Sequence, residues 1–132
     1  QQPHWPHVHA HARGPLSDAE LPGYVRGCQA ILGLNQATDR AGRQLSYLKL
    51  RDLEFPGLGA CYLTEHNDDV SAALDVGREV LTYRSLAEAA ELLHELPTQP
   101  ARVAQIGAAG RRRVLAEHTW AARLPELAAA LR

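Results

Sequence analysis

The sequence lacks several features that would point to particular classes of protein. It has no apolar run near the ~20 residues that a membrane span needs. No basic leader followed by an apolar stretch is visible either, so no signal peptide is indicated. Its 14 Lys and Arg residues almost balance its 15 Asp and Glu residues, which leaves a net charge of −1. We therefore expect no membrane span, and neither a nucleic acid nor an anionic membrane as partner.

Cysteine is scarce and methionine is absent. Cys28 and Cys61 are isolated thiols in apolar surroundings, which favours core positions, a reducing compartment and hence a cytoplasmic protein. The absence of Met, an initiator included, favours a fragment or a processed product. With 45% apolar and 22% charged residues, the composition is globular. We expect residues 1–132 to form one domain, because this length supports a single core.

Short apolar runs alternate with helical patterns along the chain. We expect strands at residues 8–12, 30–34, 60–63 and 80–83, with the second strand buried on both sides, and a polar loop at 36–44. Helices are expected after the capping-box spacing of Ser17–Glu20, at 47–55, at 68–74 with Gly77 as a stop, after a second capping box at Ser85–Glu88, from Pro100 to Val114, and from Trp120 to Leu131. This alternation predicts an α/β fold, a Rossmann-like parallel sheet flanked by helices.

Three details of the helices follow from local rules. The helix at 47–55 should stop before Pro56, because proline disfavours a helical conformation at the preceding residue. The helix after Ser85 should bury a face made of Leu86, Ala90, Leu93 and Leu96. Pro125 should be an internal defect or a new start in the last helix.

A dense mixed-charge cluster directly precedes a buried strand. It contains Lys49, Arg51, Asp52 and Glu54, and it follows the strand expected at 30–34. In an open parallel sheet, ligands bind where the strands end, so this topology places the cluster at that edge. A carboxylate there can accept two hydrogen bonds from sugar hydroxyls, and cations can neutralise phosphates. The alternative is a surface helix held by ion pairs such as Arg51–Glu54.

Four segments, in this order, resemble one family. They are HARGPLSDAELPGYVRGCQAILGLN (11–35), LKLRDLEFPGLGACYLTE (48–65), GREVLTY (77–83) and AAGRRRVLAEHTWAAR (108–123). Together they resemble the C-terminal, donor-binding half of GT-B-type glycosyltransferases, within a group 1 subgroup related to spore-maturation proteins. The resemblance implies transfer of a sugar from a nucleotide diphosphate sugar to an acceptor hydroxyl.

The resemblance also implies roles for individual residues. Glu54 matches the glutamate that binds the ribose hydroxyls, and Lys49 and Arg51 fall near the diphosphate. Gly14, Pro15 and Leu16 match the turn that borders the base. Ser46, followed by Tyr47, stands where many retaining relatives carry a second glutamate, so donor-sugar recognition and stereochemistry cannot be carried over. The candidate nucleotide-sugar-binding residues are Glu54, Lys49, Arg51, Gly14, Pro15, Leu16, Ser46, Tyr47 and Gly59, of which Gly59 with Gly57 lets backbone come close. No catalytic residue is assigned.

The partners follow from the same resemblance. The acceptor site and general base belong to an N-terminal domain of such enzymes, which is absent from residues 1–132. We therefore expect this chain alone to be inactive. No cofactor or metal is implied, since the donor itself is the substrate. An exposed sheet edge would favour pairing with another copy.

Other interpretations of the sequence stay open. Ser46 and the missing domain are compatible with a non-catalytic scaffold or interaction module derived from such a half. A response-regulator-like domain is disfavoured, because no strand ends in paired acids with a downstream lysine. His7, His9 and His11 would share one face of a strand and could bind zinc, but no Cys or carboxylate lies nearby to complete the site. We expect His66 and His118 to be cap or packing residues, and residues 111–113 to be a solvated helical face.

Overall fold

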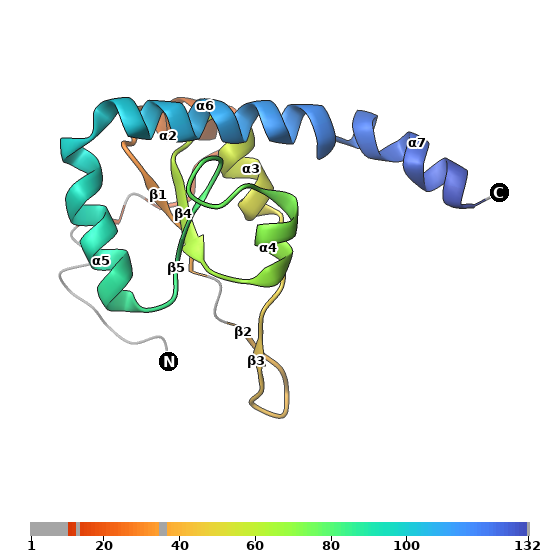
Figure 1. Cartoon of the computed structure of the whole chain (residues 1–132), viewed down its shortest axis with the longest axis horizontal. Helices are drawn as coiled ribbons and strands as arrows, with labels where there is room; N and C mark the ends of the chain where they lie inside the picture. Colours follow the sequence, from red (N-terminus) through yellow and green to blue (C-terminus); the bar gives the residue numbers. More distant parts are fainter. Residues whose placement is uncertain (1–10, 13, 35–36, 132) are drawn as a thin grey trace.

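The chain folds around a small parallel sheet. The computed structural model describes residues 11–12, 14–34 and 37–131. The sheet contains β1 (Ile31–Leu32), β4 (Tyr62–Glu65) and β5 (Leu81–Tyr83) in the order β1-β4-β5 (Figure 1). Ile31 pairs with Tyr62, and Leu63 pairs with Leu81, both in parallel register. The predicted Rossmann-like parallel sheet flanked by helices is confirmed.

Helices surround this sheet, and a hairpin extends from it. The remaining elements are α2 (Leu21–Gly27), the β2–β3 hairpin (Ala37–Thr38 and Gln44–Leu45), α3 (Arg51–Gly57), α4 (Asp68–Ala73), α5 (Leu86–Glu95), η1 (Leu96–Thr98), α6 (Pro100–Glu117) and α7 (Trp120–Ala130). The long helix α6 runs across one end of the sheet, and the hairpin lies beyond the other end (Figure 1). None of the described helices combines the length and apolar character needed to cross a bilayer.

Alternate residues of β4 face two different halves of the core. Cys61 and Leu63 pack with Leu81 and Ile106 in one cluster, which α5, η1 and α6 cover. Tyr62 packs with Val70 and Val114 on the other side, where α3 and α4 lie. Successive side chains of a strand point to opposite faces, and a parallel sheet is normally buried on both. β4 is therefore the centre of the fold.

Two glycines bring α6 against the backbone of its neighbours. A Cβ at position 107 would overlap the carbonyl oxygen of Gly59. A Cβ at position 110 would lie 2.5 Å from the carbonyl oxygen of Glu79 and 3.1 Å from Cβ of Pro56. α6 consequently packs more closely on α3 and on the turn before β5 than a helix with larger residues could.

The first two predicted elements differ from the structure. Residues 8–10 of the predicted first strand lie outside the described residues, and His11 and Ala12 are not in a strand. The Ser17–Glu20 segment is a turn in which the Glu20 carboxylate accepts bonds from the Ser17 N–H and Oγ–H, and α2 begins only at Leu21. A helix starting at Asp18 would place Pro22 in its interior, where proline cannot donate a bond.

Two predictions in the middle of the chain are also wrong. The segment 36–44 was expected to be a loop but contributes β2 and the start of β3, joined by a turn in which Asp39 Oδ1 accepts from the N–H groups of Ala41 and Arg43. The predicted helix at 47–55 begins later, at Arg51, and contains Pro56 in its last turn. Pro56 lacks the N–H that would bond the Asp52 carbonyl, but the last turn is still closed by other bonds, including one from the Ala60 N–H to the Phe55 carbonyl.

The strands are shifted or shorter than predicted. The second strand comprises only Ile31–Leu32, and it is not buried on both sides, since Leu32 is 41% exposed at the edge of the sheet. The third begins at Tyr62 instead of Ala60. The predicted helix 68–74 is confirmed as α4, which ends at Ala73, while Gly77 (φ +87°) belongs to the turn that follows.

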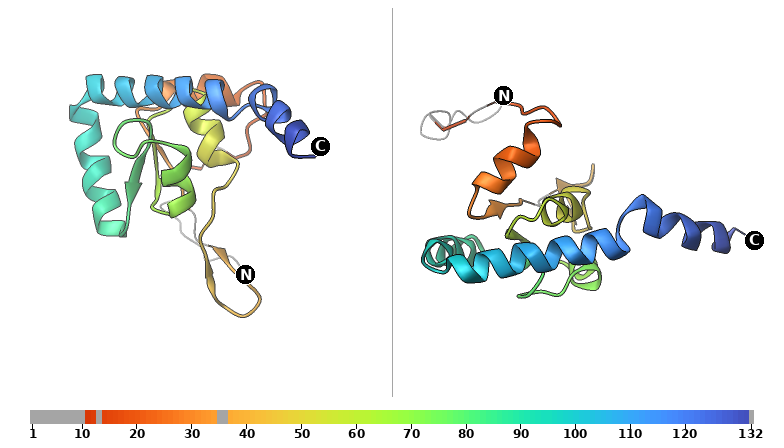
Figure 2. Two further views of the ribbon diagram at one scale, coloured as in Figure 1. Left: turned by 45° about the vertical axis from the view of Figure 1, so that its right-hand side comes forward. Right: turned by 90° about the horizontal axis from the view of Figure 1, so that it is seen from above.

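The last three helices start where the sequence predicted, with one change of face. α5 is capped by Ser85 Oγ, but its inward side contains Ala89, Leu92 and Leu93, followed by Leu96 of η1, whereas Leu86 and Ala90 of the predicted face are exposed. α6 starts at Pro100 as predicted. α7 contains Pro125 and buries none of its residues. It extends away from the sheet (Figure 2).

Candidate functional site

The carboxyl ends of the three parallel strands meet at the end of the sheet opposite α6. We call this region the strand-end edge and define it as residues 33–34, 48–51, 65–67 and 83–84. The His66 N–H donates to the Tyr83 carbonyl over 2.8 Å, which joins the ends of β4 and β5. The Tyr83 hydroxyl donates to the Gly33 carbonyl over 2.9 Å, which joins β5 to the end of β1. The edge is thus a single connected surface at which α3 begins.

A buried carboxylate attaches the start of α3 to this edge. Asp52 has no exposed surface. One of its oxygens accepts from the Lys49 N–H at 2.7 Å, and the other from the hydroxyls of Tyr62 (2.9 Å) and Thr64 (3.2 Å). Burying a carboxylate is costly unless donors surround it, and here donors come from two elements. Sequence reasoning counted Asp52 only as one charge in a cluster and missed this role.

The tyrosine partner of Asp52 is held in its protonated form. Burial raises the pKa of the Tyr62 hydroxyl well above its usual value; the Thr64 hydrogen bond partly opposes this effect, and the charge of Asp52 adds to it. Burial likewise raises the pKa of Tyr83, with a further contribution from the charge of Glu65. Both phenols are consequently hydrogen-bond donors at neutral pH.

The three charged residues predicted to bind the donor lie around Asp52. Arg51 and Glu54 are exposed on the first turn of α3, and Lys49 is half-buried just before it. The Lys49 ammonium lies 5.6 Å from the centre of the Tyr47 ring, a distance typical of a cation–π contact. Among the described residues, no cation lies within 4 Å of the Glu54 carboxylate, so the ion-paired surface helix is not what forms here. The arrangement offers two cations and one carboxylate to solvent.

The other predicted residues are spread more widely. Ser46 and Tyr47 are exposed in the segment that leads into α3. Gly14, Pro15 and Leu16 lie on an exposed segment before α2, and no hydrogen bond or ion pair among the described residues joins them to α3. Gly59 (φ +90°) follows the other end of α3, beside Arg111 of α6. Among the predicted residues, the structure shows a contact between Tyr47 and Lys49 and places Arg51 and Glu54 on one turn of α3, while Gly59 lies at the other end of that helix.

A hollow lies where α3, α4 and the α6–α7 junction meet, and Leu48 and Leu50 of the strand-end edge form part of its wall. It has a volume of about 620 Å³. Its walls are mainly apolar and include Leu48, Leu50, Leu53, Ala72, Ala73 and Trp120. Its polar side chains already have partners within the protein. Asp69 Oδ2, for example, accepts from the Leu48 N–H over 3.3 Å. We therefore place the candidate site at the strand-end edge and not in this hollow.

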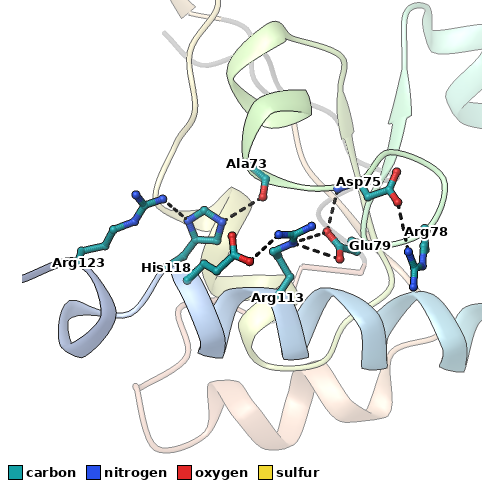
Figure 3. Close-up of polar contacts among 8 residues, drawn as sticks. Ala73, Asp75, Arg78, Glu79, Arg113, His118 and Arg123 are labelled. Atoms are coloured by element: carbon teal, nitrogen blue, oxygen red, sulfur yellow. Dashed lines mark hydrogen bonds and ion pairs between the residues drawn. The ribbon is translucent and has the colours of Figure 1, made fainter. Parts of the chain in front are cut away.

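A chain of polar contacts runs along α6 to the α6–α7 junction, and three of its residues, Glu117, His118 and Arg123, line the hollow (Figure 3). His118 Nε2 is 3.0 Å from the Ala73 carbonyl, and its Nδ1 is 3.0 Å from an Arg123 nitrogen. A carbonyl only accepts, so His118 Nε2–H is the donor in the first contact, and a guanidinium only donates, so Nδ1 is the acceptor in the second. His118 is thus a cap for α4, as predicted.

Two arginines earlier in α6 also bond other parts of the chain. Arg113 bonds Glu79 at 3.0 Å and pairs with Glu117, and the Arg111 guanidinium donates to the Gly57 carbonyl over 2.8 Å (Figure 3 shows the Arg113 contacts). Arg111 and Arg112 are exposed, as predicted for a solvated face, whereas Arg113 is half-buried; the bonds of Arg111 and Arg113 were not predicted. Sequence periodicity could not show the bonds of Arg111 and Arg113, because their partners Gly57 and Glu79 lie 54 and 34 residues away.

The zinc hypothesis concerns residues that the structure mostly leaves out. His7 and His9 lie outside the described residues, and His11 is exposed. Within residues 11–12, 14–34 and 37–131, no group of three or more His, Cys, Asp or Glu side chains is placed to hold a metal ion. Cys28 and Cys61 are free thiols, the second of them buried as predicted.

Comparison with known proteins agrees with this fold. The model of a family described as glycosyl transferase-like matches residues 2–129, almost the whole chain. No curated protein and no solved structure gives a significant match. The matched region contains the sheet, the strand-end edge and every described helix up to α7. The chain belongs to the glycosyl transferase-like family.

Proposed function

We propose that this chain is the donor-binding half of a GT-B-type glycosyltransferase that acts on a nucleotide diphosphate sugar. The family match over residues 2–129 carries this proposal. In the reaction, the bond between the anomeric carbon and a diphosphate oxygen breaks. A bond from that carbon to an acceptor hydroxyl oxygen forms, and the hydroxyl proton passes to a base. The leaving group is a nucleoside diphosphate, which accumulates negative charge as the bond breaks.

The strand-end edge and the first turn of α3 supply groups suited to that leaving group. Lys49 and Arg51 can stabilise the developing charge on the diphosphate, which is electrostatic catalysis and requires no cofactor from this chain. The Glu54 carboxylate, exposed and without an ion-pair partner among the described residues, can accept two hydrogen bonds from the ribose diol. Ligands of open parallel sheets bind at this edge, because the loops there carry the polar groups.

The acceptor site and the base are assigned in this proposal to a second domain of the same protein. The chain by itself is then expected to bind nucleotides weakly and to turn over no donor. The experiment is a titration of the 132-residue chain with UDP, GDP and dTDP and their sugars, followed by calorimetry and, for weak binding, by amide chemical shifts. The full-length protein is assayed for sugar transfer in parallel.

A matched pair of variants tests the role of Glu54. Replacing Glu54→Gln removes one charged acceptor and should weaken binding of the preferred nucleotide about 10- to 150-fold, which corresponds to about 1.5–3 kcal/mol. Glu95→Gln removes an exposed carboxylate at the end of α5 and should leave the affinity unchanged. Equal affinities for both variants would remove Glu54 from the site. A full-length protein that transfers no sugar from any nucleotide donor would refute the proposed reaction and favour a scaffold.

A further inference from the structure

A second acidic residue of the charged cluster points in the opposite direction to Glu54. Asp52 is buried and Glu54 is exposed, although they are two positions apart on one helix. Two helical steps turn a side chain through ~200°, so one carboxylate can face the sheet while the other faces solvent. The two acids therefore have different tasks, and Asp52 cannot contact a ligand in solution from this position.

The contacts of Asp52 join two parts of the chain. The Tyr62 and Thr64 hydroxyls belong to the central strand β4, which is rigidly paired on both sides. The Lys49 N–H belongs to the segment that leads into α3. Leu50, the residue that caps α3, makes no side-chain cap of its own. The Asp52 carboxylate thus supplies the fixed point for the backbone from which Lys49 and Arg51 project.

The strand next to β4 leaves room for this contact. A Cβ at position 33 would overlap the Tyr62 hydroxyl, so glycine at this position leaves room for the donor to Asp52. A separate bond, from the Tyr83 hydroxyl to the Gly33 carbonyl at 2.9 Å, joins β5 to the end of β1. The Tyr62 and Thr64 hydroxyls thus connect β4 to Asp52, and Asp52 connects them to the segment that leads into α3.

We propose that Asp52 is a positioning residue that fixes Lys49, Arg51 and Glu54 in the geometry that receives the diphosphate and ribose of the donor; this inference rests on the proposed function. All three residues lie within three positions of Asp52, on either side of it. Without the carboxylate, the Lys49 N–H loses its acceptor and the entry into α3 loses its link to β4. The charged side chains would then sample several positions. The nucleotide would have to order them on binding, and this entropy cost would lower its affinity.

The test compares Asp52→Asn with a variant that weakens the core elsewhere. Val114→Ala removes methyl groups from α6 on the same side of the sheet and leaves the Asp52 network intact. Amide hydrogen exchange and nucleoside diphosphate binding are measured on the folded protein for both. We expect the Lys49 amide to exchange at least about 10-fold faster in Asp52→Asn than in Val114→Ala, after both are corrected for global stability. The affinity for the preferred nucleotide should fall at least about 10-fold in Asp52→Asn alone.

Milder variants keep the test decisive if Asp52→Asn does not fold. Tyr62→Phe and Thr64→Val each remove one donor to the carboxylate and retain the shape of the side chain, so each should produce a smaller change of the same kind. If Asp52 only stabilises the fold, all these variants, once folded and corrected for global stability, should bind the nucleotide as Val114→Ala does, and that result would overturn the inference. If the unmodified chain and the full-length protein bind none of the nucleotides, the proposed function fails. The exchange of the Lys49 amide still decides whether Asp52 fixes this segment.

Discussion

The packing of α6 predicts that a glycine-to-alanine substitution in this helix lowers stability, although such a substitution usually raises it. Replacing a glycine by alanine inside a helix normally stabilises a protein by up to about 1 kcal/mol, because glycine loses more backbone entropy on folding. At position 110 the new Cβ would lie 2.5 Å from the Glu79 carbonyl oxygen and 3.1 Å from Cβ of Pro56. Real Cβ atoms do not approach an oxygen so closely, so α6 must move away from both neighbours.

The loss of stability in Gly110→Ala is set by the cost of overpacking and by the gain in helix propensity. Neither contact can be relieved by rotating a flexible side chain, since one neighbour is backbone and the other is a proline ring. Overpacking of this kind costs about 1–3 kcal/mol, and the propensity gain offsets at most about 1 kcal/mol of it. Gly110→Ala should therefore lower the free energy of unfolding by about 1–2 kcal/mol. The assay is urea denaturation at equilibrium, in which the midpoint falls while the slope m stays unchanged.

A control on the same helix separates packing from propensity. Ala108 is exposed two positions earlier, and Ala108→Gly should cost about 1 kcal/mol from propensity alone. Together the two variants show alanine favoured at position 108 and glycine favoured at position 110. A Gly110→Ala protein that is more stable than the original would refute the close approach of α6 to α3 and the turn before β5.

Two further predictions concern ionisable groups. Burial raises the pKa of the Cys61 thiol to about 11, with the charge of Arg102 opposing it slightly. At pH 8 only ~0.1% of the Cys61 side chain is then thiolate, the form that reacts. An aromatic disulfide reagent should therefore react with Cys28 first and with Cys61 only after denaturation. Equal reaction rates of the two thiols in the native protein would contradict this. In the hairpin, the N–H and then the side chain of Arg43 lower the pKa of Asp39. A lowered pKa contributes stability above the unfolded value of ~3.9 that is lost as pH falls through the folded value. Amide shifts of the hairpin turn should therefore report melting only below about pH 4, and Asp39→Asn should remove this pH dependence; a midpoint above that value would contradict it.

The sequence predicted the order of elements well, because the signals for it are local. The cap at Ser85 and the start at Pro100 depend on residues within one helical turn, and both are confirmed. The hairpin at 37–45 was missed, although Asp39 and Gly42 (φ +77°) carry turn signals that could have indicated it. The short strands did not reach the length at which alternation becomes readable.

The missed parts of the site depend on distant residues. The burial of Asp52 follows from hydroxyls ten and twelve residues further along the chain, on a strand whose register the helix spacing does not fix. Tyr62 and Thr64 do share one face of a strand, so two hydroxyl-bearing residues at spacing two after an acidic helix were a usable signal. By contrast, the exposure of Leu86 reflects how α5 docks on the sheet, which no local pattern contains.

The placement of α6 gives the two ends of the sheet a different tolerance of substitutions. At the end of the sheet that α6 covers, Gly107 and Gly110 pack directly against backbone atoms, so a larger side chain at either position would displace the helix. At the opposite end, no long helix of the part of the chain that the structure describes covers the strand termini, and loops form the surface there (Figure 1). Substitutions can accumulate in those loops without loosening the packing of α6, so the loops can diverge while the architecture is kept.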